Sequence, residues 1–170
     1  EMLGERVGNV KKGDVVLMHS ASGGVGLLLC QWAKARGATV IGTASSALKC
    51  KEITRAGAKH AIDTSKKDVA KEVAKITKGQ GVDVVFDPVG KDTYETSLAC
   101  LKDRGLLASF GGASGPVPDV NLNEFRYMAR AWRLTRASLF NYTAGREDLL
   151  HSSKRVFAMI RSGKVKVKIK

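Results

Sequence analysis

The sequence has few cysteines, and they are scattered. Cys30, Cys50 and Cys100 lie far apart and have no clustered histidines beside them. Zinc sites need thiolates or imidazoles at short spacing. The sequence therefore predicts no metal site, and we expect the three cysteines to be reduced and structural.

Long apolar runs are absent as well. A membrane-spanning helix needs about 20 mostly apolar residues, and no run in this chain approaches that length. No signal peptide opens the chain. We therefore expect a cytoplasmic protein with no membrane partner.

Aromatic residues make up only 6% of the chain, and acidic residues are outnumbered, with 29 Lys and Arg against 16 Asp and Glu. The net charge of +13 attracts anions, either a phosphorylated cofactor or a nucleic acid. The lysines are dispersed, however, and few aromatics are present for base stacking. The composition favours solvated lysines, and nucleic-acid binding is the less favoured alternative.

The 170 residues are expected to form one domain, with strands and helices alternating along the chain. The predicted strands are 14–19, 39–43, 59–62, 82–87, 106–110 and 132–138, and the predicted helices include 24–36, 91–101 and 121–131. This alternation predicts an α/β fold, a Rossmann-type doubly wound parallel sheet with helices on both faces.

Several local signals refine these elements. Ser45 or Ser46 is expected to cap the second helix, and Ser65 with Asp68 resembles a capping box before the third. The acidic pair Glu147–Asp148 favours a helix start. A stripe of apolar residues then follows that helix up to Gly163, and comprises Leu149, Leu150, Val156, Phe157 and Ile160. In the tail 164–170, Val165, Val167 and Ile169 alternate with lysines as in a half-exposed strand.

A glycine-rich turn follows the first predicted strand. Its pattern is Ala21-x-Gly23-x-x-Gly26, in the segment His19 to Gly26. Gly23 would let the backbone approach a pyrophosphate, and Gly26 would let the helix pack on the sheet, with free N–H groups facing the anion. Because Ala21 replaces the first glycine of the fingerprint, a ligand-free tight turn is the alternative. The strand before the turn and the helix after it favour a dinucleotide.

The stretch after the second predicted strand lacks an acid. A carboxylate about 20 residues beyond the turn holds the ribose of NAD. Here residues 42–49 contain none, and the first is Glu52. Ser45, Ser46 and Lys49 suit a 2′-phosphate, although Ser45 could be only a helix cap and Lys49 only a surface residue. We therefore predict NADP(H) as the cofactor.

Two further turns, Asp87–Gly90 and Phe110–Gly112, end predicted strands. Ligands of open parallel sheets bind beyond the carboxyl ends of the strands. Glycines there would allow the backbone to approach a ribose or a nicotinamide ring, although either loop taken alone is an ordinary turn.

The residues then match a known family. Ser22 to Lys34, Val40 to Thr43, Gly90 to Leu98 and Ser109 to Gly111 resemble zeta-crystallin-like quinone oxidoreductases, of the zinc-free medium-chain dehydrogenase/reductases. The similarity extends over nearly the whole chain. It implies reduction of quinones or other α,β-unsaturated carbonyls (enones) by NADPH.

The resemblance also implies roles for particular residues. Gly23, Gly24, Val25 and Gly26, beside Ser22, would bind pyrophosphate, while Thr43, Ser45, Ser46, Lys49 and Thr64 would lie on the adenosine side, and Val89, Gly90, Phe110, Gly111 and Gly112 on the nicotinamide side. Two positions depart from the family. Thr64 replaces a tyrosine near the adenosine, and Gly112 replaces an asparagine after the Phe-Gly pair.

In the family a β-rich catalytic domain precedes this region, and we expect residues 1–170 to be the dinucleotide-binding domain without it. No catalytic residue is therefore assigned. Two functions remain as alternatives to quinone reduction. One is that of an enoyl-thioester or alkenal reductase, and the other is that of a nucleic-acid-binding relative. If residues 132–138 form an edge strand, a homodimer could form through it.

Overall fold

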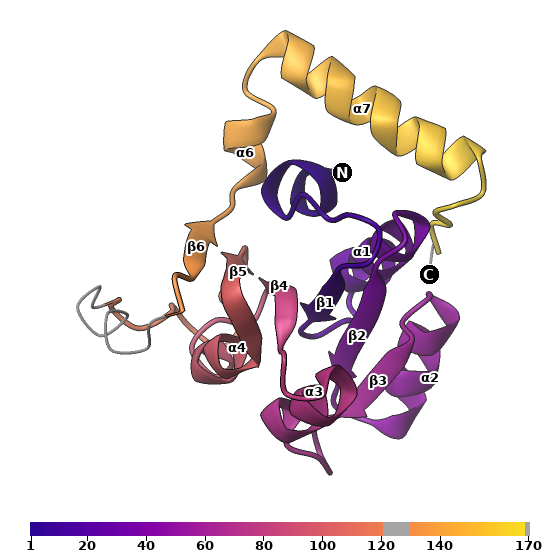
Figure 1. The fold of residues 1–170 in the computed structure, drawn as a ribbon. Coiled ribbons are helices and arrows are strands. Elements are labelled where there is room, and N and C mark those ends of the chain that lie inside the picture. The colour runs from indigo at the N-terminus through magenta and orange to yellow at the C-terminus, as the bar shows by residue number, and fades with distance from the viewer. Residues whose placement is uncertain (121–129, 169–170) are drawn as a thin grey trace.

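The computed structural model describes residues 1–120 and 130–168. Six parallel strands lie in the order β3-β2-β1-β4-β5-β6 (Figure 1). They are β1 (Val15–Met18), β2 (Thr39–Ala44), β3 (His60–Asp63), β4 (Val82–Asp87), β5 (Leu101–Ser109) and β6 (Arg133–Arg136). This order confirms the predicted Rossmann-type fold, and the direction of winding switches between β1 and β4.

Helices cover both faces of the sheet because successive strand residues point to opposite sides. Val16 and Met18 pack toward one face, whereas Leu17 packs toward the other. The first face carries η1 (Met2–Val7), α1 (Gly24–Ala35) and α2 (Ala47–Arg55), and the second carries α3 (Val69–Thr77) and α4 (Tyr94–Cys100). The remaining described helices are α6 (Leu139–Tyr142) and α7 (Arg146–Arg161).

Helix α7 and the N-terminal helix η1 lie side by side above one face of the sheet (Figure 1). Glu5 of η1 joins them: it pairs with Arg155 of α7 at 2.7 Å and with Arg36 at 3.2 Å. Its carboxylate also accepts a hydrogen bond from the indole of Trp32 in α1. Arg6 pairs with Asp148 at 2.7 Å. Residues about 150 positions apart are thus held together.

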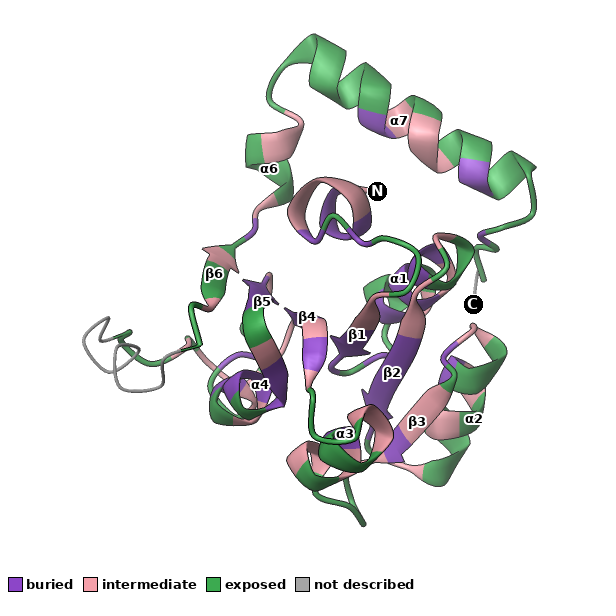
Figure 2. Ribbon diagram, in the orientation of Figure 1, coloured by how far each residue is buried: buried purple, intermediate pink, exposed green. Residues whose placement is uncertain are grey.

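Most of the apolar stripe predicted for α7 is exposed rather than packed against the rest of the molecule. Ser152 and Met159 are the buried residues of this helix, and Met159 packs with Trp32 and Val165. Four of the five stripe residues are exposed, namely Leu149, Leu150, Phe157 and Ile160. Figure 2 shows α7 mostly exposed, with its buried positions on the side toward η1. The helix is held partly by its polar contacts to η1.

The tail does not form the predicted strand over its described residues, 164–168. Val165 is buried, but its neighbour Lys166 bonds to a side chain instead of a strand. The amide of Gln31 accepts from the Lys166 N–H at 2.8 Å and donates to the Lys166 carbonyl at 3.2 Å. One glutamine side chain thus takes the place of a neighbouring strand. Ile169 lies outside the described residues.

Three other expectations change in detail. Asp68 itself caps α3 by accepting from the Lys71 N–H, whereas the Ser65 hydroxyl donates to Asp63, so the predicted capping box is wrong. Helix α4 begins at Tyr94 rather than Lys91, and β5 already begins at Leu101.

Most of the helix predicted over 121–131 lies outside the described residues. Strand β6 (Arg133–Arg136) confirms a strand within the predicted range 132–138, and it is the last strand in the order of the described sheet.

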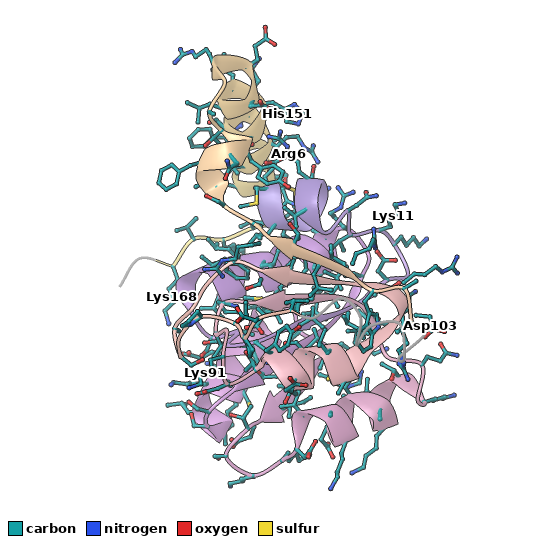
Figure 3. All side chains as sticks on the ribbon, turned by 90° about the vertical axis from the view of Figure 1, so that its left-hand side faces the viewer. Arg6, Lys11, Lys91, Asp103, His151 and Lys168 are labelled. Carbon is teal, nitrogen blue, oxygen red and sulfur yellow. The ribbon has the colours of Figure 1, made fainter. Side chains whose placement is uncertain are left out.

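Charge is spread over the molecule. In the view of Figure 3, Lys11 and Lys91 lie on opposite sides of the sheet. No described helix is long and apolar enough to cross a membrane.

Candidate functional site

The glycine-rich turn leaves the carboxyl end of β1 and is held by both neighbouring strands. The His19 N–H donates to the Phe86 carbonyl of β4 at 3.1 Å. On the other side, the Ala21 N–H donates to the carbonyl of Thr43 in β2 at 2.9 Å. Ser20, between them, has a positive φ of 49°, and its N–H donates to the Thr43 hydroxyl. The turn is therefore fixed at the point where the sheet changes winding direction.

Two glycines lie in close contact with Ala21, the residue that replaces the first glycine of the fingerprint. Gly42 of β2 lies opposite, and a Cβ there would come 3.0 Å from the Ala21 methyl group. The missing side chain of Gly42 thus leaves space that the Ala21 methyl group shares with Ile53, whose Cδ1 would lie 2.9 Å from the same Cβ. A Cβ on Gly26 would come 2.6 Å from the Ala21 carbonyl oxygen, so α1 packs closely on the turn only with glycine there. Gly24, in contrast, faces open space.

A cavity of about 330 Å³ opens beside this turn, between the ends of β1, β2, β3 and β4. Six of the predicted site residues line it: Ser22, Thr43, Ser45, Lys49, Thr64 and Val89. Its lining also includes His19 and Ser20, from the start of the predicted glycine-rich segment, and five residues that the sequence analysis did not select: Ala44, Val69, Asp92, Thr93 and Thr96. The cavity is hence formed by residues that follow four strands, together with residues of α2, α3 and α4.

The end of the cavity after β2 carries hydroxyls and a cation. The Lys49 ammonium donates to the Ser45 hydroxyl at 3.1 Å, and both side chains are exposed. Ser46 has a structural role, because its hydroxyl accepts a hydrogen bond from the Lys49 N–H and caps α2. Glu52, the first acid after β2, lines a separate groove with the tail. The pair Ser45–Lys49 can therefore offer two donors to an anion.

A buried carboxylate organises the end of β4. Asp87 is 1% exposed and accepts from the N–H groups of Val89 and Gly90. The hydroxyls of Thr93 and Ser97 also donate to it, at 2.8 and 2.9 Å. These contacts satisfy the charge and tie β4 to α4. The sequence analysis missed this role, because the two hydroxyls become partners only once α4 packs beside the strand.

The loops after β4 and β5 pack backbone against backbone. A Cβ on Gly90 would lie 2.4 Å from the Gly115 carbonyl oxygen, and one on Gly111 would lie 2.2 Å from that of Pro88. Arg136 of β6 donates to the Gly111 carbonyl and, at 3.0 Å, to the Ser109 hydroxyl. The two glycines are required by this loop contact. Gly112 belongs to the same loop, where a Cβ would lie 3.3 Å from Gly115.

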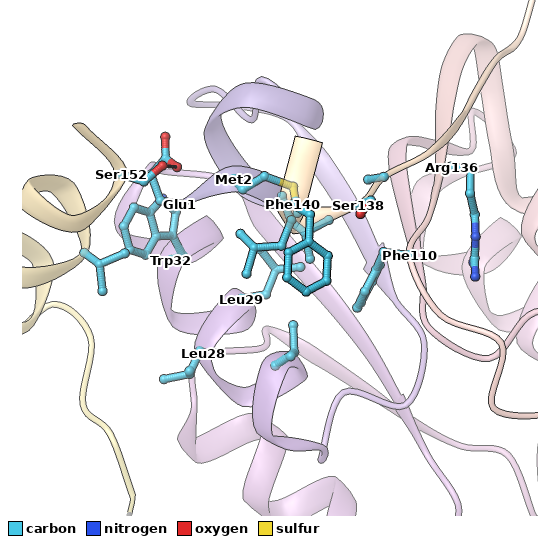
Figure 4. A pocket seen from close by; sticks show the side chains of 15 residues that line it. Glu1, Met2, Leu28, Leu29, Trp32, Phe110, Arg136, Ser138, Phe140 and Ser152 are labelled. Carbon is cyan, nitrogen blue, oxygen red and sulfur yellow. Dashed lines mark hydrogen bonds between the residues drawn. The ribbon is translucent and has the colours of Figure 1, made fainter. Parts of the chain in front are cut away.

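A second, apolar cavity of about 580 Å³ lies between η1, α1, α6 and α7. Figure 4 shows Leu29, Phe110 and Phe140 around it, with Arg136 to one side. Val25, at the start of α1, and Phe110, after β5, place this cavity next to the glycine-rich turn. Of the predicted site residues, six thus line the polar cavity, and Val25 and Phe110 line the apolar one.

The cysteines are free, as predicted, and two of them are buried. Burial raises the pKa of the Cys30 thiol to about 12, and that of Cys100 to about 12 as well, so neither supplies a thiolate. No group of three or more His, Cys, Asp and Glu within residues 1–120 and 130–168 could hold a metal ion. The absence of a metal site remains a prediction.

The fold and the turn at the switch point define a Rossmann-type α/β domain. Residues 24–154 match the family described as zinc-binding dehydrogenase, so the chain belongs to this family. That family description does not by itself assign zinc to this chain, because the described residues supply no ligand set for it.

Among curated proteins, the quinone oxidoreductase of Salmonella typhimurium is 47% identical over 160 residues, which are 94% of this chain and 49% of that protein. The 2-haloacrylate reductase of a Burkholderia species is 41% identical over 91% of this chain and 46% of its own length. The chain spans about half the length of the curated relatives it matches.

The crystal structure of Escherichia coli quinone oxidoreductase complexed with NADPH superimposes with a TM-score of 0.94 at 42% identity. The match covers 99% of this chain and 52% of that one. These similarities confirm the predicted resemblance to quinone oxidoreductases of the medium-chain dehydrogenase/reductase superfamily.

Proposed function

We propose that residues 1–170 are the NADP(H)-binding domain of a quinone oxidoreductase. The observation that carries this proposal is the polar cavity beside the glycine-rich turn, with Ser45 and Lys49 at its end. An aspartate at that end would repel a 2′-phosphate, whereas an ammonium and a hydroxyl donate to it. The solved relative that carries NADPH supports the same assignment.

The residues of the turn fit a pyrophosphate. Gly23 and Gly24 are exposed, and the start of α1 offers N–H groups that have no partner within the helix. We propose that Ser22 to Gly26 bind the pyrophosphate, that Thr43, Ser45, Ser46, Lys49 and Thr64 lie around the adenosine, and that Val89, Gly90, Phe110, Gly111 and Gly112 border the nicotinamide. When bound, the nicotinamide supplies the hydride.

The proposed substrate is a quinone, reduced by the whole protein rather than by these residues alone. The relatives are about twice as long, and we propose that their unmatched half corresponds to a catalytic domain. The apolar cavity beside Phe110 suits one side of a flat, apolar substrate. A second candidate is an enone or other activated alkene, favoured by the similarity to 2-haloacrylate reductase.

Titration with NADPH and NADH, followed by nicotinamide fluorescence, tests the cofactor. The chain is expected to bind NADPH more tightly than NADH. Lys49→Ala should weaken NADPH binding about tenfold, the value of one charged hydrogen bond, and leave NADH binding unchanged. Lys51→Ala, which removes an exposed lysine of the same helix, is the matched control. Equal or absent binding of both nucleotides by the folded chain would refute the proposal.

We also propose a homodimer through β6, which ends the sheet. The Ala137 N–H donates to the Ser109 carbonyl of β5, so by alternation the Leu134 N–H points away from β5. Leu134→Pro should remove a donor to a second copy and shift a dimer to monomer in sedimentation, whereas Leu134→Val should not. A wild-type chain that is monomeric at high concentration would contradict this.

A cytoplasmic location is proposed with these assignments, in keeping with the free cysteines. Nucleic-acid binding is the alternative from another class. A steep salt dependence of affinity for a single-stranded oligonucleotide would favour it, and negligible binding would remove it.

A further inference from the structure

His19 is a buried imidazole at the wall of the polar cavity. It directly follows β1 and is 3% exposed, yet it is one of the residues that line the cavity, together with Lys49, Thr64 and Val69. Among the described residues, its Nε2 atom has no hydrogen-bond partner. Such an atom is unusual, because buried polar atoms are nearly always paired.

The surroundings keep this imidazole neutral. Burial lowers the pKa of His19, and the charge of Asp87 opposes that shift without reversing it. Asp87 does not relieve the unpaired nitrogen, since its oxygens accept from the N–H groups of Val89 and Gly90 and from the hydroxyls of Thr93 and Ser97. A neutral imidazole nitrogen can either donate or accept one hydrogen bond, according to its tautomer.

We propose that His19 Nε2 makes a direct hydrogen bond to the adenosine half of the bound dinucleotide. The inference rests on the proposed function and names a residue outside the glycine-rich fingerprint. The adenosine half is indicated because the same cavity continues past the ends of β2 and β3, where Lys49 and Thr64 lie. In this fold, the segment after the second strand contacts the adenosine ribose.

The unpaired nitrogen also predicts an unusual relation between binding and stability. Removing a buried polar atom that has no partner costs the free protein nothing and can stabilise it. A histidine that serves only packing would show the opposite, because its replacement would lower both stability and affinity. Binding and unfolding measured together therefore distinguish a cofactor contact from a structural residue.

The test compares His19→Phe and His19→Gln with the wild-type chain. The probes are NADPH and 2′-phospho-ADP-ribose, which lacks the nicotinamide. His19→Phe should weaken both by about two- to tenfold, the value of one hydrogen bond, with no loss of stability in urea without nucleotide. His19→Gln, whose amide nitrogen can occupy the Nε2 position, should bind more tightly than His19→Phe. His151→Phe, on the exposed side of α7, is the control and should change neither quantity.

A measurement on the unmutated chain covers the case in which a variant fails to fold. The chain has three histidines, so their imidazole nitrogens can be followed by ¹⁵N NMR. The His19 Nε2 signal should shift when 2′-phospho-ADP-ribose is added, and the His151 signals should not. Wild-type affinity of His19→Phe, or parallel losses of affinity and stability, would overturn the inference while leaving the proposed function intact. Failure of the wild-type chain to bind either probe would overturn both.

Discussion

At the scale of single residues, the glycine-rich turn depends on two complementary pairs of positions. The methyl group of Ala21 fits because Gly42 has no side chain, and α1 approaches Ala21 because Gly26 has none. The fingerprint in the sequence was enough to predict the turn and the role of Gly26. It could not reveal the part of Gly42, which comes from another strand and meets Ala21 only in the folded sheet.

Gly26→Ala tests this packing. Its Cβ would lie 2.6 Å from a backbone oxygen that cannot rotate away, so α1 would have to shift. Overpacking of this kind costs about 1–3 kcal/mol of the free energy of unfolding, measurable by urea denaturation.

Gly24→Ala is the matched control, because it adds the same methyl group two residues earlier, in open space. It should change stability by no more than about 0.5 kcal/mol. Equal effects of the two substitutions would show that the close approach of Gly26 to Ala21 is unimportant.

The buried pair His19 and Asp87 marks the limit of sequence reasoning at this scale. Asp87 accepts hydrogen bonds from the hydroxyls of Thr93 and Ser97, at and within the start of α4, and His19 is buried beside the cavity. Neither the partners of Asp87 nor the burial of His19 can be read from a local sequence pattern. Lys49 and Ser45, in contrast, are four residues apart on one short segment, so their proximity could be predicted.

At the scale of elements, the strands and helices of the sheet follow the apolar pattern, with shifted boundaries at α4 and β5, whereas the C-terminal elements do not. In β4, all six predicted residues form the strand. A short apolar run sufficed there because both faces of the sheet are covered. In α7 most of the apolar stripe faces outward, and the helix contacts the N-terminal residues through Arg155, which pairs with Glu5, and Ser152, which donates to Glu1. Polar contacts between distant segments decided its orientation, and no periodicity records them.

The bond between Gln31 and the tail belongs to this scale. Gln31→Leu removes both hydrogen bonds to the Lys166 backbone and should release residues 164–168 from α1. A released segment opens more often, so trypsin should cleave after Lys166 faster than in the wild type. Mass spectrometry of the early fragments measures this.

Gln80→Leu, at an exposed turn, is the control and should leave the cleavage rate unchanged. An unchanged rate in Gln31→Leu as well would mean that burial of Val165 alone holds the tail.

At the scale of the whole molecule, Glu5 joins η1, α1 and α7. Burial opposes its ionisation, but the hydrogen bond and charge of Arg155, with Arg36, hold the pKa of the carboxyl below its ordinary value. A lowered pKa means that the ionised form stabilises the fold. This contribution is present above the unfolded pKa of about 4.3 and is lost as the pH falls through the lower folded value.

Glu5→Gln should therefore cost about 1–2 kcal/mol at pH 7, a value reduced because Arg155 is partly exposed. The difference from wild type should shrink as the pH falls below about 4. Urea denaturation at several pH values measures both effects.

The control is Glu147→Gln, an exposed acid in the first turn of α7, which should cost only a few tenths of a kcal/mol through the helix dipole. A pH-independent loss in Glu5→Gln would contradict an electrostatic role for Glu5.

The same contact has a consequence for synthesis on the ribosome. Arg155 leaves the ribosome about 150 residues after Glu5, which at about 5–20 residues per second is a delay of roughly 8–30 s. Trp32 and Arg36 emerge within the first few seconds of that interval and can hold Glu5 while the sheet is completed. Helix α7 would then dock last, onto a surface that is already folded.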